Sequence, residues 1–310
     1  MNRSARGGWQ PPDLRATIAV VSGASRGVGR GVALALGDAG ATVYITARSV
    51  RGEPATENLP GTVEETAEAV SARGGTGIAV RCDHTVEGDI DSVFERIAKE
   101  QGRLDILVNN AWGGYERGTE GRFDAPFWEQ PTWRWDLFTR SLRGQFCTGR
   151  RGVPLMFHGD RALIVNISFN DRGIYLGNVP YDVVKSASDR MVLGMARDLR
   201  KWPIAAVSLH PGFVRTERVE AAWELLGEGP AQILHSPEYV GRAVALLFTD
   251  SDLLAYSGST IAVGDLAEQY GFTDVDGRRP PAFRLEGRMT LATRMERLNR
   301  VVARAEEASG

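Results

Sequence analysis

The stretch Thr17-Ile-Ala-Val-Val-Ser-Gly-Ala-Ser-Arg-Gly-Val-Gly-Arg-Gly-Val-Ala-Leu-Ala-Leu36 decides the fold of this chain. Its first six residues form an apolar run typical of a buried strand, and its last seven have the pattern of a helix. Between them, Gly23, Gly27 and Gly29 suit a tight turn, a close approach of the backbone to a pyrophosphate, and close packing of the helix on the strand. The helix would begin facing that anion. The stretch therefore predicts a strand, a phosphate-binding turn and a helix in succession.

The same alternation continues along the chain. Further apolar runs typical of strands lie at residues 41–46, 77–81, 104–109, 162–168, 204–209 and 259–263. Helical patterns lie at residues 27–39, 62–73, 89–101, 133–157, 180–201 and 237–248. Strands buried on both faces with helices between them predict one α/β domain, a Rossmann-like, doubly wound parallel sheet of seven strands with helices on both faces. We expect this domain at residues 15–265.

Two segments fall outside the alternation: an N-terminal extension at residues 1–14 and a C-terminal, partly helical extension at residues 266–310. Within the second, residues 287–305 carry apolar side chains at near-helical spacing together with many arginines. Such a basic amphipathic helix could touch a membrane surface. We favour the alternative that it packs on its own domain or on a second subunit.

Composition and charge exclude several classes of protein. The 310 residues carry a net charge of −2, so no overall basic field favours nucleic acid. Two cysteines and four scattered histidines show no metal-ligand spacing, and we expect no catalytic metal. No run approaches the ~20 apolar residues of a transmembrane segment. The polar first twelve residues do not resemble a secretory signal, so we expect a cytoplasmic protein.

A candidate proton-transfer group follows the fifth predicted strand. Tyr181 and Lys185 stand four residues apart just after Pro180, which is suited to open a helix, so their side chains would project from one face. Ser168 ends the preceding apolar run. A phenol has a pKa near ~10, so it needs a neighbouring cation to act as an acid or base at neutral pH, and Lys185 is placed to be that cation.

Residues at the ends of the predicted strands indicate the cofactor. The second strand ends in Arg48 instead of the acid that grips the ribose of NAD, and the glycine turn carries Arg26. Two guanidinium groups suit a 2′-phosphate, which favours NADP(H), although both arginines could simply be solvated. The predicted cofactor-binding residues of these segments are Gly23, Ser25, Arg26, Gly27, Val28, Gly29, Arg48, Asp83, Asn109, Asn110 and Ala111. Among them, Asp83 is a candidate reader of the adenine amino group.

These motifs, in this order and spacing, resemble the short-chain dehydrogenase/reductase family over about residues 15–265. The resemblance rests on the glycine turn, Asn109-Asn-Ala111, Ser168, Tyr181-x-x-x-Lys185 and Pro211-Gly-Phe-Val-Arg-Thr216. Longer matches, such as Gly102-Arg-Leu-Asp and Asn178-Val-Pro-Tyr, look like the subgroup around dehydrogenase/reductase member 1, whose members are regarded as NADP-dependent carbonyl reductases.

The resemblance implies a role for each matching residue. Tyr181 would protonate the substrate oxygen, Ser168 would hydrogen-bond that oxygen, and Lys185 would hold the nicotinamide ribose, favour the tyrosinate and relay protons to solvent. The segment containing Pro211, Gly212, Val214 and Thr216 would bind the cofactor, with Val214 and Thr216 on the nicotinamide amide. Ser141 stands where the family often has a relay asparagine, and Trp112 stands where it commonly has glycine.

Aromatic residues are concentrated beyond the fourth predicted strand. Between residues 112 and 138 the chain has Trp112, Tyr115, Phe123, Phe127, Trp128, Trp133, Trp135 and Phe138. Most would serve core or subunit packing, but two or three, Trp112 among them, would line an apolar substrate pocket. Tyr115 and Trp223 are the other wall candidates, the latter in a loop at residues 213–236 that could close over the cofactor.

The sequence thus predicts an NADP(H)-dependent oxidoreductase that reduces an apolar, bulky ketone or aldehyde, or oxidises the corresponding alcohol. By the family resemblance, the protein would be a homodimer or homotetramer formed through residues 133–157 and 180–201. Two alternatives stay open: an NAD-linked alcohol dehydrogenase, and a dinucleotide-binding sensor or scaffold without turnover.

Overall fold

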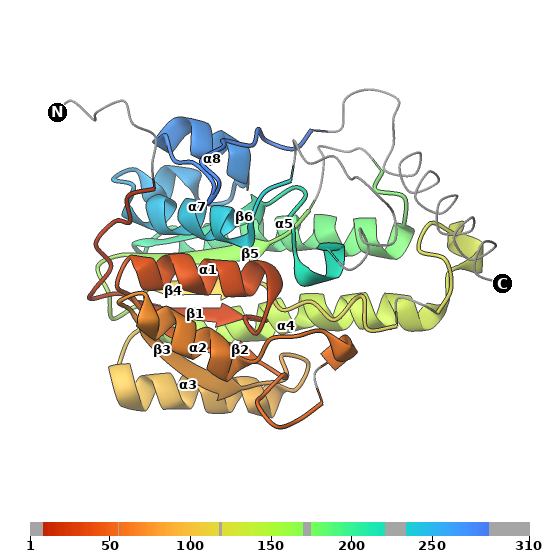
Figure 1. Cartoon of the computed structure of the whole chain (residues 1–310), viewed down its shortest axis with the longest axis horizontal. Helices are drawn as coiled ribbons and strands as arrows, with labels where there is room; N and C mark the ends of the chain where they lie inside the picture. Colours follow the sequence, from red (N-terminus) through yellow and green to blue (C-terminus); the bar gives the residue numbers. More distant parts are fainter. Residues whose placement is uncertain (1–8, 55, 118–119, 170–174, 221–233, 285–310) are drawn as a thin grey trace.

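A seven-stranded, all-parallel sheet forms the centre of the molecule, as predicted. The computed structural model describes residues 9–54, 56–117, 120–169, 175–220 and 234–284. Its strands are β1 (Ile18–Ser22), β2 (Thr42–Ala47), β3 (Thr76–Arg81), β4 (Ile106–Asn109), β5 (Ala162–Ile167), β6 (Ile204–His210) and β7 (Thr260–Ala262). Their order in the sheet is β3-β2-β1-β4-β5-β6-β7 (Figure 1). The order reverses between β1 and β4, and a ligand crevice is expected there, at the carboxyl ends of the strands.

Helices cover both faces of the sheet (Figure 1). The helices α1 (Gly27–Asp38), α2 (Val63–Ala72) and α7 (Pro237–Thr249) share one apolar core with the sheet. The helices α3 (Glu87–Gln101), α4 (Thr132–Met156) and α5 (Val179–Leu199) share a second core on the opposite face. The side chains of β1 and β5 are buried at every position, because each of these strands lies between the two helical layers.

Particular residues at the starts of α5 and α7 fix the helices that position the site. The side chain of Asn178 accepts a hydrogen bond of 2.9 Å from the backbone nitrogen of Tyr181, and Pro180 lies in the first turn of α5. On the other face, α1 approaches α7 so closely that a Cβ atom on Gly31 would lie 2.2 Å from the carbonyl carbon of Pro237. Only glycine permits this contact, which holds α1, with the phosphate-binding turn at its start, against the body of the domain.

The chain remains packed on the domain beyond the last strand. The predicted domain boundary at residue 265 falls inside α8 (Val263–Tyr270). Because α8 begins at Val263, the strand β7 is shorter than the apolar run that predicted it. The Tyr239 hydroxyl donates to the carbonyl oxygen of Pro280 at 2.8 Å, and the backbone nitrogen of Ser236 donates to Asp274 at 2.7 Å. The rest of the C-terminal extension (285–310), with the predicted basic helix, and residues 1–8 lie outside the described residues. In the described chain, no helix is long and apolar enough to cross a membrane.

Candidate active site

The phosphate-binding turn is tied to the end of β4 by polar contacts. The Ser22 hydroxyl accepts from the backbone nitrogens of Asn110 and Ala111 at 2.9 and 3.0 Å, and it donates to the carbonyl of Val108 at 3.2 Å. In return, the Asn110 side-chain amide donates to the carbonyls of Ser22 and Gly23 at 3.0 and 3.1 Å. The predicted cofactor residue Asn110 therefore shapes the turn with its side chain.

The turn itself has a geometry that only glycine provides. Gly23 and Gly27 have φ angles of +64° and +56°, which disfavour larger residues. A Cβ atom on Gly23 would lie 2.7 Å from the Cα of Ala111, and one on Gly29 would lie 2.4 Å from the carbonyl oxygen of Gly23. The turn therefore has no Cβ atoms at these three positions, where a pyrophosphate would approach the start of α1. These residues fit a dinucleotide.

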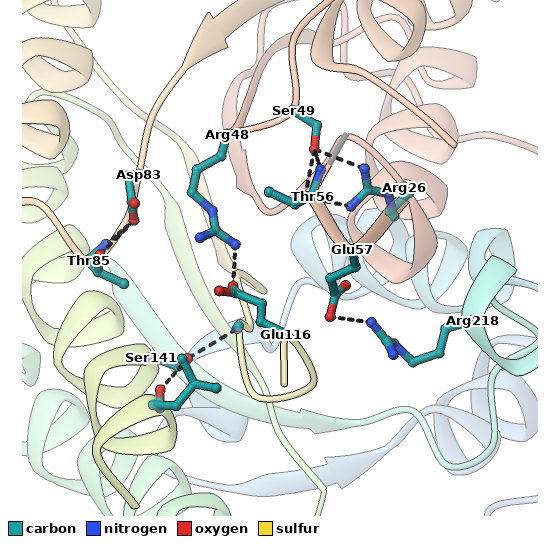
Figure 2. A network of polar contacts seen from close by, with 12 residues as sticks. Arg26, Arg48, Ser49, Thr56, Glu57, Asp83, Thr85, Glu116, Ser141 and Arg218 are labelled. Carbon is teal, nitrogen blue, oxygen red and sulfur yellow. Dashed lines mark hydrogen bonds and ion pairs between the residues drawn. The ribbon is translucent and has the colours of Figure 1, made fainter. Parts of the chain in front are cut away.

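The two predicted phosphate-binding arginines have different surroundings (Figure 2). The guanidinium group of Arg26 donates to the carbonyls of residues 59–61 and to the hydroxyls of Ser49 and Thr56 at 2.9 to 3.2 Å. It therefore holds the loop after β2 in place. By contrast, Arg48 pairs with one side chain, Glu116, and keeps a third of its own surface exposed (32%). Arg48, unlike Arg26, can therefore bind a 2′-phosphate without breaking hydrogen bonds to backbone carbonyls.

A cavity of about 280 Å³ lies at the carboxyl ends of the strands. Most of the predicted cofactor residues line it: Gly23, Ser25, Arg26, Gly27, Val28, Arg48, Asp83, Asn109, Asn110, Ala111 and Thr216. The Asp83 carboxylate accepts from the backbone nitrogen and hydroxyl of Thr85 at 2.9 and 2.8 Å at its rim (Figure 2). Gly29, Tyr181, Lys185, Pro211, Gly212 and Val214 are not part of the cavity wall.

The Tyr181 phenol lies inside a cluster of aromatic rings. The rings of Trp112, Phe123 and Phe138 approach it edge-on, with centroid separations of 5.8, 5.7 and 6.1 Å. The side chain of Tyr115 is a polar neighbour of its hydroxyl. Burial, and then the neighbouring Tyr115, raise the pKa of Tyr181 well above its ordinary value. The phenol therefore holds its proton at neutral pH, which suits an acid in carbonyl reduction.

Lys185 lies close to Tyr181 but points at a different ring. Its ammonium nitrogen is 4.2 Å from the centroid of the Trp112 ring and 5.6 Å from that of Tyr181. Burial lowers the pKa of Lys185 to about 8, and the charge of Asp189 opposes this shift only in part. The role of Lys185 in favouring a tyrosinate stays a prediction, because the ammonium group lies nearer to the Trp112 ring than to the Tyr181 ring in this structure.

Ser168 is brought close to Lys185, with its hydroxyl turned to the backbone. It donates a hydrogen bond of 3.0 Å to the carbonyl of Lys185. Behind it, Asp189 contacts His210 at 3.1 Å. Although burial alone would raise the pKa of Asp189, hydrogen bonds from His210 and Ser208 keep that pKa below its ordinary value. Asp189 is a buried anion in the shell that supports the site.

Ser141 and Asn109 have contacts of their own. The Ser141 hydroxyl accepts from the backbone nitrogen of Gly113 at 3.3 Å and lines the cavity (Figure 2). The Asn109 amide donates to the side-chain oxygen of Asn166 at 2.9 Å, within the protein interior. Ser141 therefore anchors the segment that carries Trp112.

The predicted aromatic wall divides into two groups. Trp112, Phe123 and Phe138 pack in one small core with Tyr181, and Tyr115 lines the cavity. Phe127, Trp128 and Trp135 are exposed and lie outside that core. The other wall candidate, Trp223, lies outside the described residues.

Sequence reasoning missed two carboxylates that reach the predicted cofactor residues. Glu116 pairs with Arg48, and Glu217 accepts from the backbone nitrogen of Gly27 at 2.9 Å. Glu116 lies in a turn after β4, and Glu217 is the first residue of a helical segment after β6. No periodicity or motif distinguishes them from solvated acids, since their partners are 68 and 190 residues away in the chain.

Comparisons with known proteins agree with this geometry. The family model described as short chain dehydrogenase matches residues 17–225. "Dehydrogenase/reductase SDR family member 1" of Mus musculus is 39% identical over 277 residues, which cover 86% of this chain and 85% of the relative. The protein of the same name from Homo sapiens is also 39% identical, with the same coverage.

Solved structures share the fold. A putative dehydrogenase from Xanthomonas campestris superposes with a TM-score of 0.73 at 25% identity, covering 89% of this chain and 99% of the other. A metagenomic short-chain oxidoreductase, solved in complex with NADP, superposes with a TM-score of 0.61 at 25% identity, covering 80% of this chain and 96% of the other.

Proposed function

This chain belongs to the short-chain dehydrogenase family, whose chemistry is oxidation of an alcohol or reduction of a carbonyl group, and we propose that it is an NADP(H)-dependent reductase of apolar ketones or aldehydes. One observation carries the proposal: the phenol of Tyr181 is enclosed by aromatic rings beside the ammonium group of Lys185. The similar solved oxidoreductase that is complexed with NADP supports the choice of cofactor.

The residues of this chain would share the work of proton transfer. When bound, the reduced nicotinamide supplies a hydride to the carbonyl carbon, and negative charge develops on the carbonyl oxygen. Tyr181 donates its proton to that oxygen, and Lys185 offsets the charge left on the phenolate. Ser168 serves as a second donor to the oxygen once its hydroxyl turns from the Lys185 carbonyl, a rotation about one side-chain bond.

The aromatic surroundings favour an apolar substrate. Trp112, Phe123 and Phe138 exclude water from the phenol, which strengthens each polar contact with the reacting oxygen. We therefore propose a bulky apolar carbonyl compound as the substrate.

We also propose assembly through α4 and α5. Both helices present apolar side chains to solvent, including Trp135 and Phe146 on α4 and Val183 and Leu193 on α5. Apolar faces of this kind support a homodimer or homotetramer.

The activity is tested by NADPH and NADH oxidation with a panel of ketones, aldehydes and quinones. We expect turnover of at least one apolar carbonyl compound with NADPH. No turnover with any compound would favour the sensor or scaffold alternative.

The cofactor preference is tested by binding titrations. We expect Arg48→Ala to raise the Kd for NADPH about tenfold and that for NADH less than about twofold, because only NADPH carries the 2′-phosphate. The control is Arg96→Ala, at an exposed position on α3. Equal affinity of the wild type for both cofactors would favour the NAD-linked alternative.

A further inference from the structure

The backbone nitrogen at the start of α1 donates a hydrogen bond to a carboxylate. Glu217, one residue past Thr216, accepts a hydrogen bond of 2.9 Å from the backbone nitrogen of Gly27. Gly27 is the first residue of α1 and lines the cavity, as does Glu217. A helix N-terminus reached by a glycine turn is the place where a dinucleotide pyrophosphate binds. The Glu217 carboxylate therefore lies where the pyrophosphate would accept hydrogen bonds.

A second carboxylate lies on Arg48. Glu116, in the segment that follows β4, forms an ion pair and hydrogen bond with the Arg48 guanidinium (Figure 2). Both side chains line the same cavity and are only partly exposed, 25% for Glu116 and 32% for Arg48. Carboxylate and phosphate oxygens bind a guanidinium group in the same bidentate manner, so the two anions compete for it.

The two carboxylates come from the segments that follow β4 and β6. Glu116 follows Trp112, whose ring contacts those of Tyr115 and Tyr181. Glu217 lies beside Arg218, which pairs with Glu57 across the cavity (Figure 2). Glu217 occupies a backbone donor that would bind the pyrophosphate of either dinucleotide. Glu116 occupies a guanidinium group that would bind only a 2′-phosphate.

We propose that Glu116 weakens the preference of this enzyme for NADP(H) by competing with the 2′-phosphate for Arg48, and that Glu217 competes with the pyrophosphate at Gly27. The Glu116 half rests on the proposed NADP(H) dependence. Binding of a ligand that displaces a side chain is weakened by the free energy of the contact it breaks. NADP(H) must displace both carboxylates, whereas NAD(H) displaces Glu217 alone. Glu116 therefore reduces the difference between the affinities for NADP(H) and NAD(H) that Arg48 creates.

The test is a set of glutamine variants titrated with NADPH and NADH. Glutamine keeps the size of the side chain and removes its charge. We expect Glu116→Gln to lower the Kd for NADPH about threefold or more and to change that for NADH by less than about twofold. We expect Glu217→Gln to lower both Kd values by the same factor. Glu120→Gln, at an exposed position paired with Arg117, is the control and should change neither.

A double variant separates this inference from the proposed function. In the Arg48→Ala background, Glu116→Gln should no longer change the Kd for NADPH, because the competition needs the guanidinium group. The cofactor-free Glu116→Gln protein should also have a lower Tm than the wild type, since it has lost an ion pair. An unchanged or higher NADPH Kd in Glu116→Gln, with Arg48→Ala still selective, would overturn the inference alone. A nonselective Arg48→Ala would overturn the NADP(H) proposal itself.

Discussion

Replacing Lys185 by methionine should stabilise the protein at neutral pH while it abolishes turnover. Lys185 is 9% exposed, and burial lowers its pKa from 10.5 to about 8. At 1.36 kcal/mol for each tenfold change in proton affinity, the fold disfavours the ammonium group by about 3 kcal/mol. Its contact with the Trp112 ring, at 4.2 Å, offsets about 1 kcal/mol of this. Methionine fills nearly the same volume without charge, so we expect a net gain of about 2 kcal/mol at pH 7.

The pH dependence follows from the direction of the shift. Because the pKa of Lys185 is lower in the folded state than in the unfolded state, the destabilisation is complete below pH 8 and disappears as the pH rises to 10.5. The advantage of Lys185→Met over the wild type should therefore shrink across that range. Other titrating groups are common to both proteins, so they cancel in the difference.

Urea denaturation of both proteins at pH 7 and at pH 10 measures this difference. Lys201→Met, at an exposed position just after α5, is the control and should show no comparable gain. A Lys185→Met protein that is less stable than the wild type at pH 7, or an advantage that does not depend on pH, would refute the reasoning. Such a result would mean that the ammonium group stabilises the fold. The predicted result would instead show stability sacrificed for a cation at the reaction centre.

Two further predictions concern packing and a buried histidine. Gly31→Ala should lower the free energy of unfolding by about 3 kcal/mol, because the new Cβ would lie 2.2 Å from the backbone of Pro237. Gly194→Ala, in α5 with open space around its Cβ, should raise the free energy of unfolding by about 0.5 to 1 kcal/mol. Equal effects of the two substitutions in urea denaturation would contradict this prediction. Burial lowers the pKa of His84 from 6.5 to about 4, so about 3 kcal/mol of stability should be lost as the pH falls from 6.5 through 4. His84→Gln should flatten that loss and the exposed His158→Gln should not; parallel stability profiles for the wild type and His84→Gln would exclude it.

Most of the fold could be predicted because its strands are buried on both faces. The runs assigned to β1 and β5 match the structure within one residue, since every side chain of these two strands is buried. The end of β7 was less predictable. Val263 continues the apolar run but begins α8, where its burial serves helix packing instead of the sheet.

The site could be predicted where function depends on residues at strand ends, and not where it depends on how loops fold. The sequence is enough to predict that the glycine turn joins β1 to α1 and that Tyr181 lies in the first turn of α5. The environment of Arg26 could not be predicted, because its carbonyl partners at residues 59–61 come from a loop without regular pattern. Glu116 and Glu217 were missed for the same reason, since each meets its partner only through tertiary structure.

The central claim is that the Tyr181 hydroxyl is the acid of a carbonyl reduction, and turnover of Tyr181→Phe tests it most directly. Phenylalanine keeps the ring contacts with Trp112, Phe123 and Phe138 and removes only the proton donor. With a carbonyl compound that the wild type reduces, we predict that kcat falls about a hundredfold or more, while the Kd for NADPH stays within about twofold. Full turnover by Tyr181→Phe on the same compound would contradict the account.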